Sequence, residues 1–290
     1  MSVVTSGPAR APWRTLFEYH VSQMQAAEVS LSTVRIDPRT NRAYPRVRTC
    51  IFRGFFAEQN LREQNINDII EDARARTPEG QPVPDHLGLN PRTLESDLLM
   101  ITTDVRAGKA GEIESSDPTA PGGPVEILVW AKPVKMQWRI RGRAFVLGAN
   151  PSEMIEQQSR QELIKWMRPA TQKTESYTHP FAEKSWTFDR EILASFANMG
   201  PGMRGSFKNP PPGAPKSRPV TDPYLKLGQQ SSDLHDEIAR QNFRILVIRP
   251  EAVEATDFTF SEVGNRMQWT LMTSTTNPGE MRWELDELWP

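Results

Sequence analysis

Alternating apolar and polar residues predict several short strands along this 290-residue chain. The clearest pair covers 125–130 and 135–147. In the second segment Met136, Trp138 and Ile140 fall on one face, while the residues between them are polar. This two-residue period is typical of a strand with one buried face.

The same criteria predict a hairpin from 30–36 and 45–56, and further strands at 98–103, 242–248, 253–260, 266–273 and 282–290. Arg249-Pro250 is expected to end the strand at 242–248, because proline cannot donate to a ladder. Helical spacing predicts helices over 12–29, 65–75, 104–113 and within 151–198. Short strands joined as hairpins favour a mainly β protein with peripheral helices, built as a closed antiparallel barrel.

Composition limits the classes of partner. The formal net charge is −1, so no global field draws the chain to nucleic acid or to an anionic membrane. No 18-residue apolar run and no signal-peptide pattern occur, which predicts a soluble, cytoplasmic protein. Cys50 is the single cysteine and is expected to be a small buried hydrophobe. The four histidines are scattered, and we expect surface or loop positions for them.

Arginines cluster in the second predicted strand, at Arg46, Arg48 and Arg53. Guanidinium groups grip phosphate oxygens in pairs, so this cluster is a candidate anion site. A solvated strand face is the alternative.

Hydroxyls, small residues and a lysine lie where the predicted strand at 98–103 passes into a helix: Thr102, Thr103 and Lys109. Free backbone N–H groups at a helix start, with a cation nearby, can bind an anion. Gln137 on a polar strand face could pair with the edge of a heterocycle. Arg266 near the last hairpin is a further candidate. An ordinary helix cap and solvent-exposed side chains remain the alternatives.

No glycine-rich nucleotide loop, Ser/His/Asp set or metal motif is evident in the sequence. Any redox chemistry would therefore need a cofactor.

In order along the chain, these clusters resemble the pyridoxamine 5′-phosphate oxidase-like FMN-binding family, and more closely its branch with an N-terminal PWR helix. The matching segments are 11–14 (APWR), 32–35 (STVR), 48–55 (RTCIFRGF), 101–110 (ITTDVRAGKA), 137–142 (QWRIRG), 243–250 (FRILVIRP) and Asn265-Arg266.

The resemblance implies one split-barrel domain over 1–290, with inserts at about 57–97, 150–188 and 208–238. It also implies a homodimer that binds flavin mononucleotide (FMN) at the subunit interface. The cofactor-binding residues it implies are Arg48, Thr49, Arg53, Thr102, Thr103, Lys109 and Gln137, with Arg48 and Lys109 on the phosphate. Arg266 matches a substrate-binding arginine.

Departures from the family pattern concern mainly the substrate side. Gly108 stands where the oxidases carry a second phosphate-binding arginine, and Gln268 where they carry a histidine. Phe260 and Thr270 replace a tryptophan and an arginine that contact FMN. The resemblance thus supports FMN binding better than oxidation of a phosphorylated pyridine.

One geometric question remains, because Arg48 and Arg53 are five residues apart and a regular strand sends them to opposite faces. Either a bulge intervenes or the two contact different parts of the site.

The function these features imply is that of an FMN-dependent oxidoreductase acting on an unknown small molecule. The alternatives are a flavin-carrying module without turnover, or a barrel scaffold for protein interaction. The proline-rich segment 208–223 motivates the scaffold, because extended proline runs dock into aromatic grooves.

Overall fold

The computed structural model describes residues 7–117, 120–148, 153–171, 185–259, 265–273 and 281–289. Its helices are α1 (Arg14–Ser22), α2 (Glu63–Arg76), α3 (Gly108–Ser115), α4 (Met154–Ile164), α5 (Phe188–Ala197), α6 (Pro201–Gly205) and α7 (Glu237–Asn242), with 3-10 turns η1 (Lys132–Val134) and η2 (Ser206–Lys208). Its strands are β1 (Glu28–Ile36), β2 (Ala43–Phe55), β3 (Leu94–Ser96), β4 (Leu99–Asp104), β5 (Gly123–Ala131), β6 (Met136–Leu147), β7 (Met167–Pro169), β8 (Phe243–Asp257), β9 (Asn265–Thr273) and β10 (Met281–Leu288).

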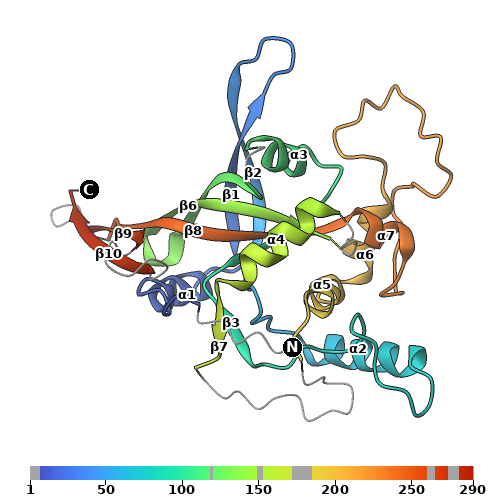
Figure 1. Cartoon of the computed structure of the whole chain (residues 1–290). Helices are drawn as coiled ribbons and strands as arrows, with labels where there is room; N and C mark the ends of the chain where they lie inside the picture. Colours follow the sequence, from blue (N-terminus) through green and yellow to red (C-terminus); the bar gives the residue numbers. More distant parts are fainter. Residues whose placement is uncertain are drawn as a thin grey trace.

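Six antiparallel strands close into a barrel in the order β4-β2-β1-β5-β6-β8, with β8 returning to β4 (Figure 1). The second half of β8 also pairs with β9, and β10 extends that ladder. This arrangement confirms the predicted antiparallel split barrel with peripheral helices.

The predicted break at Arg249-Pro250 is wrong, because β8 runs without interruption through both residues. Pro250 lies opposite Gly142, where the β6–β8 register shifts. A Cβ on Gly142 would lie 2.0 Å from the Arg249 carbonyl oxygen, so only glycine permits this approach. A bulge lets the ladder tolerate a residue that lacks an N–H.

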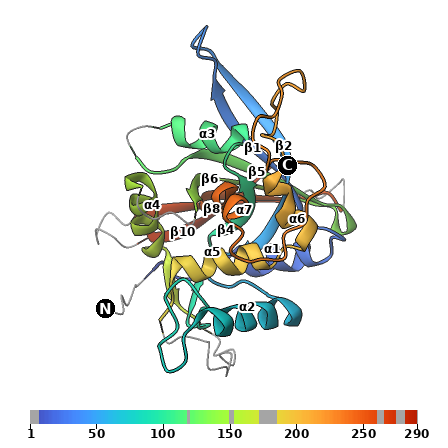
Figure 2. The same cartoon turned by 90° about the vertical axis from the view of Figure 1, so that its right-hand side faces the viewer.

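Two helices close the barrel, α1 at one end and α3 at the other (Figures 1 and 2). Phe17 of α1 packs edge-on against Trp138 of β6, with ring centroids 5.3 Å apart. Ile113 of α3 is buried in the same core. Helix α1 is shorter than the predicted 12–29, because the chain is already in β1 at Glu28.

The segment 57–97 is more than the surface excursion the sequence predicts. Ile69 and Ile70 of α2 pack with Leu89 and with Leu193 of α5 in a small core of their own. A further core joins β4, β6 and β8 to Phe196 of α5. Helices α2 and α5 thus pack together, and α5 packs in turn against the barrel strands.

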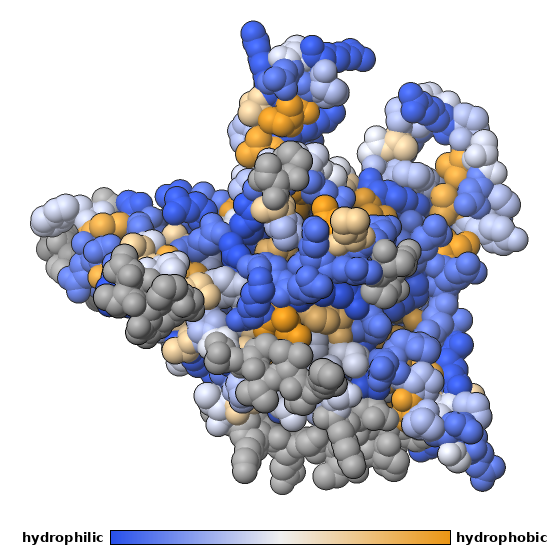
Figure 3. Space-filling model, viewed as in Figure 1, coloured by the Kyte–Doolittle hydropathy of each residue, from blue (hydrophilic) through white to orange (hydrophobic). Residues whose placement is uncertain are grey.

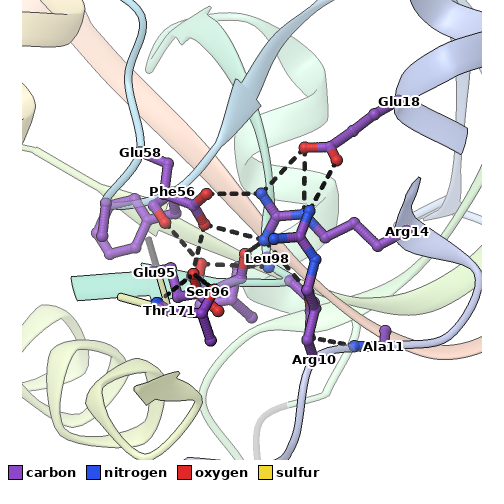
Figure 4. A network of polar contacts seen from close by, with 12 residues as sticks. Arg10, Ala11, Arg14, Glu18, Phe56, Glu58, Glu95, Ser96, Leu98 and Thr171 are labelled. Atoms are coloured by element: carbon purple, nitrogen blue, oxygen red, sulfur yellow. Dashed lines mark hydrogen bonds and ion pairs between the residues drawn. The ribbon is translucent and has the colours of Figure 1, made fainter. Parts of the chain in front are cut away.

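Arg14 anchors α1 through buried ion pairs (Figure 4). Its guanidinium lies 2.7 Å from Glu58 and 3.3 Å from Asp97, and also contacts Glu18 and the Ser96 carbonyl. All of its nitrogens have acceptors, and the side chain is almost fully buried. The network ties the first helix to the segment just before β4.

The expectation of surface histidines is wrong for His20, which is buried against the barrel core. Its Nδ1 accepts a hydrogen bond from Trp138 Nε1 at 3.2 Å. Burial lowers the pKa of His20, although the charge of Asp257 opposes this, so the neutral form is favoured.

Two projections stand out from the barrel: the β1–β2 hairpin and the loop between η2 and α7 (Figures 1 and 3). The hairpin exposes Val34, Ile36, Tyr44 and Val47. Within the loop, hydrogen bonds from Ala214 N to Pro211 O and from Arg218 N to Pro215 O close two consecutive turns. The proline-rich run is therefore folded into turns rather than extended.

Candidate functional site

Arg48 is the centre of the first predicted cluster. It lies in β2 opposite Leu31 of β1, near the α3 end of the barrel. Its Nη1 donates to Thr33 Oγ1 at 2.6 Å and its Nη2 donates to Glu112 Oε2 at 2.6 Å. The Thr33 hydroxyl in turn donates to the same Glu112 oxygen at 2.5 Å. These three side chains form a closed ring that joins β1, β2 and α3.

The ring uses only one edge of the Arg48 guanidinium. Nη1 also contacts the carbonyls of Leu31 and Arg46, whereas Nε has no acceptor among the described residues. A guanidinium has five N–H groups in a planar fork, and the Nε–Nη2 edge matches two oxygens of a phosphate. This edge of Arg48 remains available to an anion.

Lys109, in the first turn of α3, lies on the same side of the barrel as Arg48. The charges of both residues act on the Cys50 thiol between them, although burial dominates and raises the pKa of that thiol. Lys109 has no ion pair among the residues described in the structure. No side chain caps the start of α3, so its first backbone N–H groups are also free of such a partner.

Glu112 is a carboxylate among cations. Burial alone would raise its pKa, but the hydrogen bonds from Thr33 and Arg48 and the charges of Arg48 and Arg46 lower it overall. Glu112 and Lys109 are three residues apart and lie on neighbouring positions of α3. Arg46 and Arg48 thus outnumber the one acid on which they act, and Lys109 lies one turn away on the same helix.

The wall of the barrel opens beside this cluster. The β2–β4 ladder has two partner pairs, Phe52 with Ile101 and Phe55 with Leu99, with a register shift between them. Beyond it, residues 48–51 pair with β1 alone and residues 102–104 pair with β8 alone. A ligand at this split could meet side chains from both faces of the sheet.

Arg48 and Arg53 contact different sides of the sheet, Arg48 towards α3 and Arg53 towards α5. The register shift lies between Phe52 and Phe55, so Arg53 is within the bulge. Arg53 lines a water-sized cavity with Thr102, Gln59 and Ser195, against α5. Its buried Nε has no acceptor among the described residues, and burial lowers its pKa. Arg53 is therefore a second cation without a counter-ion, on the α5 side.

The remaining predicted cofactor residues differ in burial. Thr103 is buried on the Arg48 side and donates to the Asp104 carbonyl, whereas Thr49 is exposed on the outer face. Gln137 lies at the start of β6, opposite Trp130 of β5, on the outside of the barrel. Because β1 and β5 separate β6 from β2, a single chain does not bring Gln137 beside Arg48.

The predicted substrate residues lie around β9. Arg266 Nη2 is paired with Glu254 of β8 at 2.8 Å. Gln268 donates to Thr270 Oγ1 at 3.2 Å. Phe260 lies outside the described residues. Arg266 is therefore paired with a carboxylate of its own chain.

Sequence reasoning did not identify Thr33 or Glu112 as part of the site. Two features of the sequence could have identified them. Thr33 belongs to the matched segment 32–35, and Glu112 follows Lys109 at a spacing of three in a predicted helix.

A cavity of about 270 Å³ lies elsewhere, between residues 57–61 and 89–95. Its Glu58 and Glu95 are already paired with Arg14 and Arg168. The cations that could bind a phosphate are free at the split rather than at this cavity. Within the described ranges, no His, Cys, Asp and Glu side chains gather in a group that could hold a metal ion. None of the described helices is both long and apolar enough to cross a membrane.

Arg48 with a free edge, unpaired Lys109 and the uncapped α3 start fit the phosphate of FMN. The donors converge from β2 and α3 beside an open part of the barrel wall. Charge-assisted hydrogen bonds of this kind are the strong ones.

The structure resembles a pyridoxamine 5′-phosphate oxidase-related, FMN binding protein from Nostoc punctiforme PCC 73102, with a TM-score of 0.53 and 17% identity over 97% of this chain and 100% of that chain. At this identity the likeness establishes the fold alone. PhzG from Burkholderia lata 383, in complex with tetrahydrophenazine-1-carboxylic acid, gives a TM-score of 0.43 and 11% identity over 98% of this chain and 94% of that chain. At that score it carries no argument.

A search of curated proteins gives no match. Residues 10–148, by contrast, match the family model described as pyridoxamine 5′-phosphate oxidase, FMN-binding domain. The match contains β1, β2, β4 and α3, and with them Arg48 and Lys109. It confirms the family and the cofactor that the residue pattern predicts. Residues 10–148, just under half of the chain, are thus similar to the FMN-binding domain of the pyridoxamine 5′-phosphate oxidase family.

Proposed function

We propose that this protein is an FMN-dependent oxidoreductase that acts on a small molecule. The observation that carries the proposal is the excess of cations at the split. Arg48 and Lys109 have donors to spare there, inside a domain whose family binds FMN. FMN, when bound, would supply hydride and electron transfer, because the chain itself offers no other redox group apart from Cys50.

The chain's own residues would bind and orient the cofactor. Arg48 and Lys109 would hold the phosphate, with the backbone at the start of α3 and the Thr103 hydroxyl nearby. Thr49, Thr102 and Arg53 would contact the cofactor from the outer face of the split. Arg53 is the residue best placed to add positive charge near the ring, because its guanidinium is desolvated and unpaired.

Gln137 could reach the same cofactor only from a second copy of the chain. We therefore propose a homodimer. Its support is an exposed apolar wall on β1, β2 and β5, where Val47 is 72% exposed, Trp130 43% and Leu128 39%. Monomeric proteins rarely leave such side chains together in water.

The absorbance spectrum of the purified protein tests the cofactor before any substrate is guessed. We expect a yellow protein with bound FMN, and reduction of that flavin by NADPH or oxidation of pyridoxine phosphate would identify the reaction class. A colourless protein that takes up no added FMN would contradict the proposal. A yellow protein whose flavin is reduced no faster than free FMN would instead indicate a flavin carrier.

Light scattering after gel filtration tests the dimer. The chain mass is 32.9 kDa, and we expect twice this value for the wild type. Trp130→Glu should shift the protein towards the monomer, whereas the exposed Tyr224→Glu, outside the wall, should not. A wild-type monomer that still holds FMN would rule the dimer out.

A further inference from the structure

Glu112 is an unexpected residue at this position, because a carboxylate beside a phosphate site should repel the ligand. Its side chain is only 9% exposed and lies 2.6 Å from Arg48. Either it competes with the phosphate for Arg48, or it positions Arg48 for the phosphate. The two roles predict opposite effects of its removal.

The geometry of the hydrogen-bonded ring decides between them. Thr33 Oγ1 accepts from Arg48 Nη1 and donates to Glu112 Oε2, which also accepts from Arg48 Nη2. Both acceptors therefore lie on the edge of the guanidinium between Nη1 and Nη2. The opposite edge, between Nε and Nη2, is the one a phosphate can still grip in a bidentate manner.

The entropy cost of ordering the long Arg48 side chain also favours a positioning role for Glu112. An arginine that binds an anion loses side-chain rotamer entropy, because its long side chain must be held in one geometry. Glu112 and Thr33 hold Arg48 in one orientation before the ligand arrives, so binding would not bear this cost again. The surrounding Arg46 and Lys109 keep the local charge positive despite the acid.

We propose that Glu112, with Thr33, is a positioning residue that presets Arg48 for the FMN phosphate. The inference rests on the proposed phosphate contact of Arg48. It goes beyond that contact, because it assigns a role to an acid that the family pattern of cations does not include.

The experiment compares FMN with riboflavin, which lacks the phosphate, by fluorescence titration of the apoprotein. The readout is the ratio of the riboflavin Kd to the FMN Kd. A merely structural defect would weaken both ligands and leave this ratio unchanged. We expect Glu112→Ala to lower the ratio about fivefold or more, Thr33→Val to lower it less, and Glu112→Gln to keep most of it, because the amide oxygen still accepts from Arg48 and Thr33.

The matched control is Glu114→Ala, on the same helix but exposed, which should leave the ratio unchanged. In an Arg48→Ala background, Glu112→Ala should not lower the ratio any further. A rise of the ratio in Glu112→Ala would identify a competitor and overturn the inference, as would an unchanged ratio.

The controls separate this failure from that of the proposed function. If Arg48→Ala lowers the ratio and Glu112→Ala does not, only the positioning role fails. If wild type binds riboflavin and FMN equally, or Arg48→Ala changes nothing, the phosphate contact fails and the positioning role fails with it. Should Glu112→Ala not fold, Thr33→Val carries the same test in weaker form, since it removes the hydroxyl that bonds both Arg48 and Glu112 while their direct ion pair remains.

Discussion

The two ends of the barrel each hold an arginine in an ion pair, but only one of these arginines has donors left over. Arg14, at the α1 end, is surrounded by Glu18, Glu58 and Asp97, and all its nitrogens are used. Arg48, at the α3 end, faces one carboxylate and keeps a free edge. The balance of acceptors around a guanidinium thus separates an arginine that holds the fold from one that can hold a ligand.

The largest effect should come from removing Arg14, whose nitrogens all have acceptors at the α1 end of the barrel. Arg14→Ala would leave Glu58 and Asp97 without their common cation, and breaking a buried pair costs about 3 kcal/mol or more of the free energy of unfolding. Urea denaturation measures it. Arg282→Ala, which removes an exposed pair with Glu284, should cost less than about 1 kcal/mol. Equal losses in the two variants would contradict the comparison.

At the α3 end, removal of Arg48 should affect FMN binding instead. Arg48→Ala removes charge-assisted hydrogen bonds worth about 1.5–3 kcal/mol each, so we expect FMN to bind roughly tenfold to hundredfold more weakly. Riboflavin affinity should change little. Fluorescence titration measures both. If the variant bound FMN as the wild type does, Arg48 would be structural like Arg14.

Lys109 should give a smaller effect of the same kind, because it acts as a point charge without a fork. Lys109→Gln is expected to weaken FMN binding severalfold and to make it less sensitive to added salt, with no change in urea stability. Lys216→Gln, on the exposed loop, is the control and should change neither. A large loss of stability in Lys109→Gln would argue for a structural role.

The smallest expected effect is on the pH dependence of stability, and it concerns His20 at the α1 end of the barrel. Burial lowers the pKa of His20, so below its ordinary value of about 6.5 the unfolded chain binds a proton that the folded chain resists. Stability should therefore fall as the pH drops below about 6.5, by less than about 1 kcal/mol per pH unit. In His20→Gln, which keeps an acceptor for Trp138, urea denaturation at pH 7.0 and 5.5 should show a weaker pH dependence. The same slope in both proteins would show that His20 is not its source.

Much of the fold could be predicted, because strands such as β5 and β6 have a strict alternation that leaves one face buried. The prediction at Pro250 was wrong, because the strand can continue through this proline only beside Gly142. Gly142 lies opposite Pro250 in β6 but far from it in the sequence. The prediction at His20 was wrong too, because a histidine on a helix face looks the same in sequence whether water or Trp138 faces it.

For the site, the sequence determined which side chains are present: arginines at 48 and 53, hydroxyls at 102 and 103, and a lysine at 109, in the order of an FMN-binding family. It could not determine which of these donors are free. Only the tertiary structure places Thr33 and Glu112 against one edge of Arg48 and parts β2 from β4 beside it. The physical reason is that hydrogen bonds and ion pairs depend on distances of a few ångströms, whereas these residues are separated by up to 79 positions along the chain.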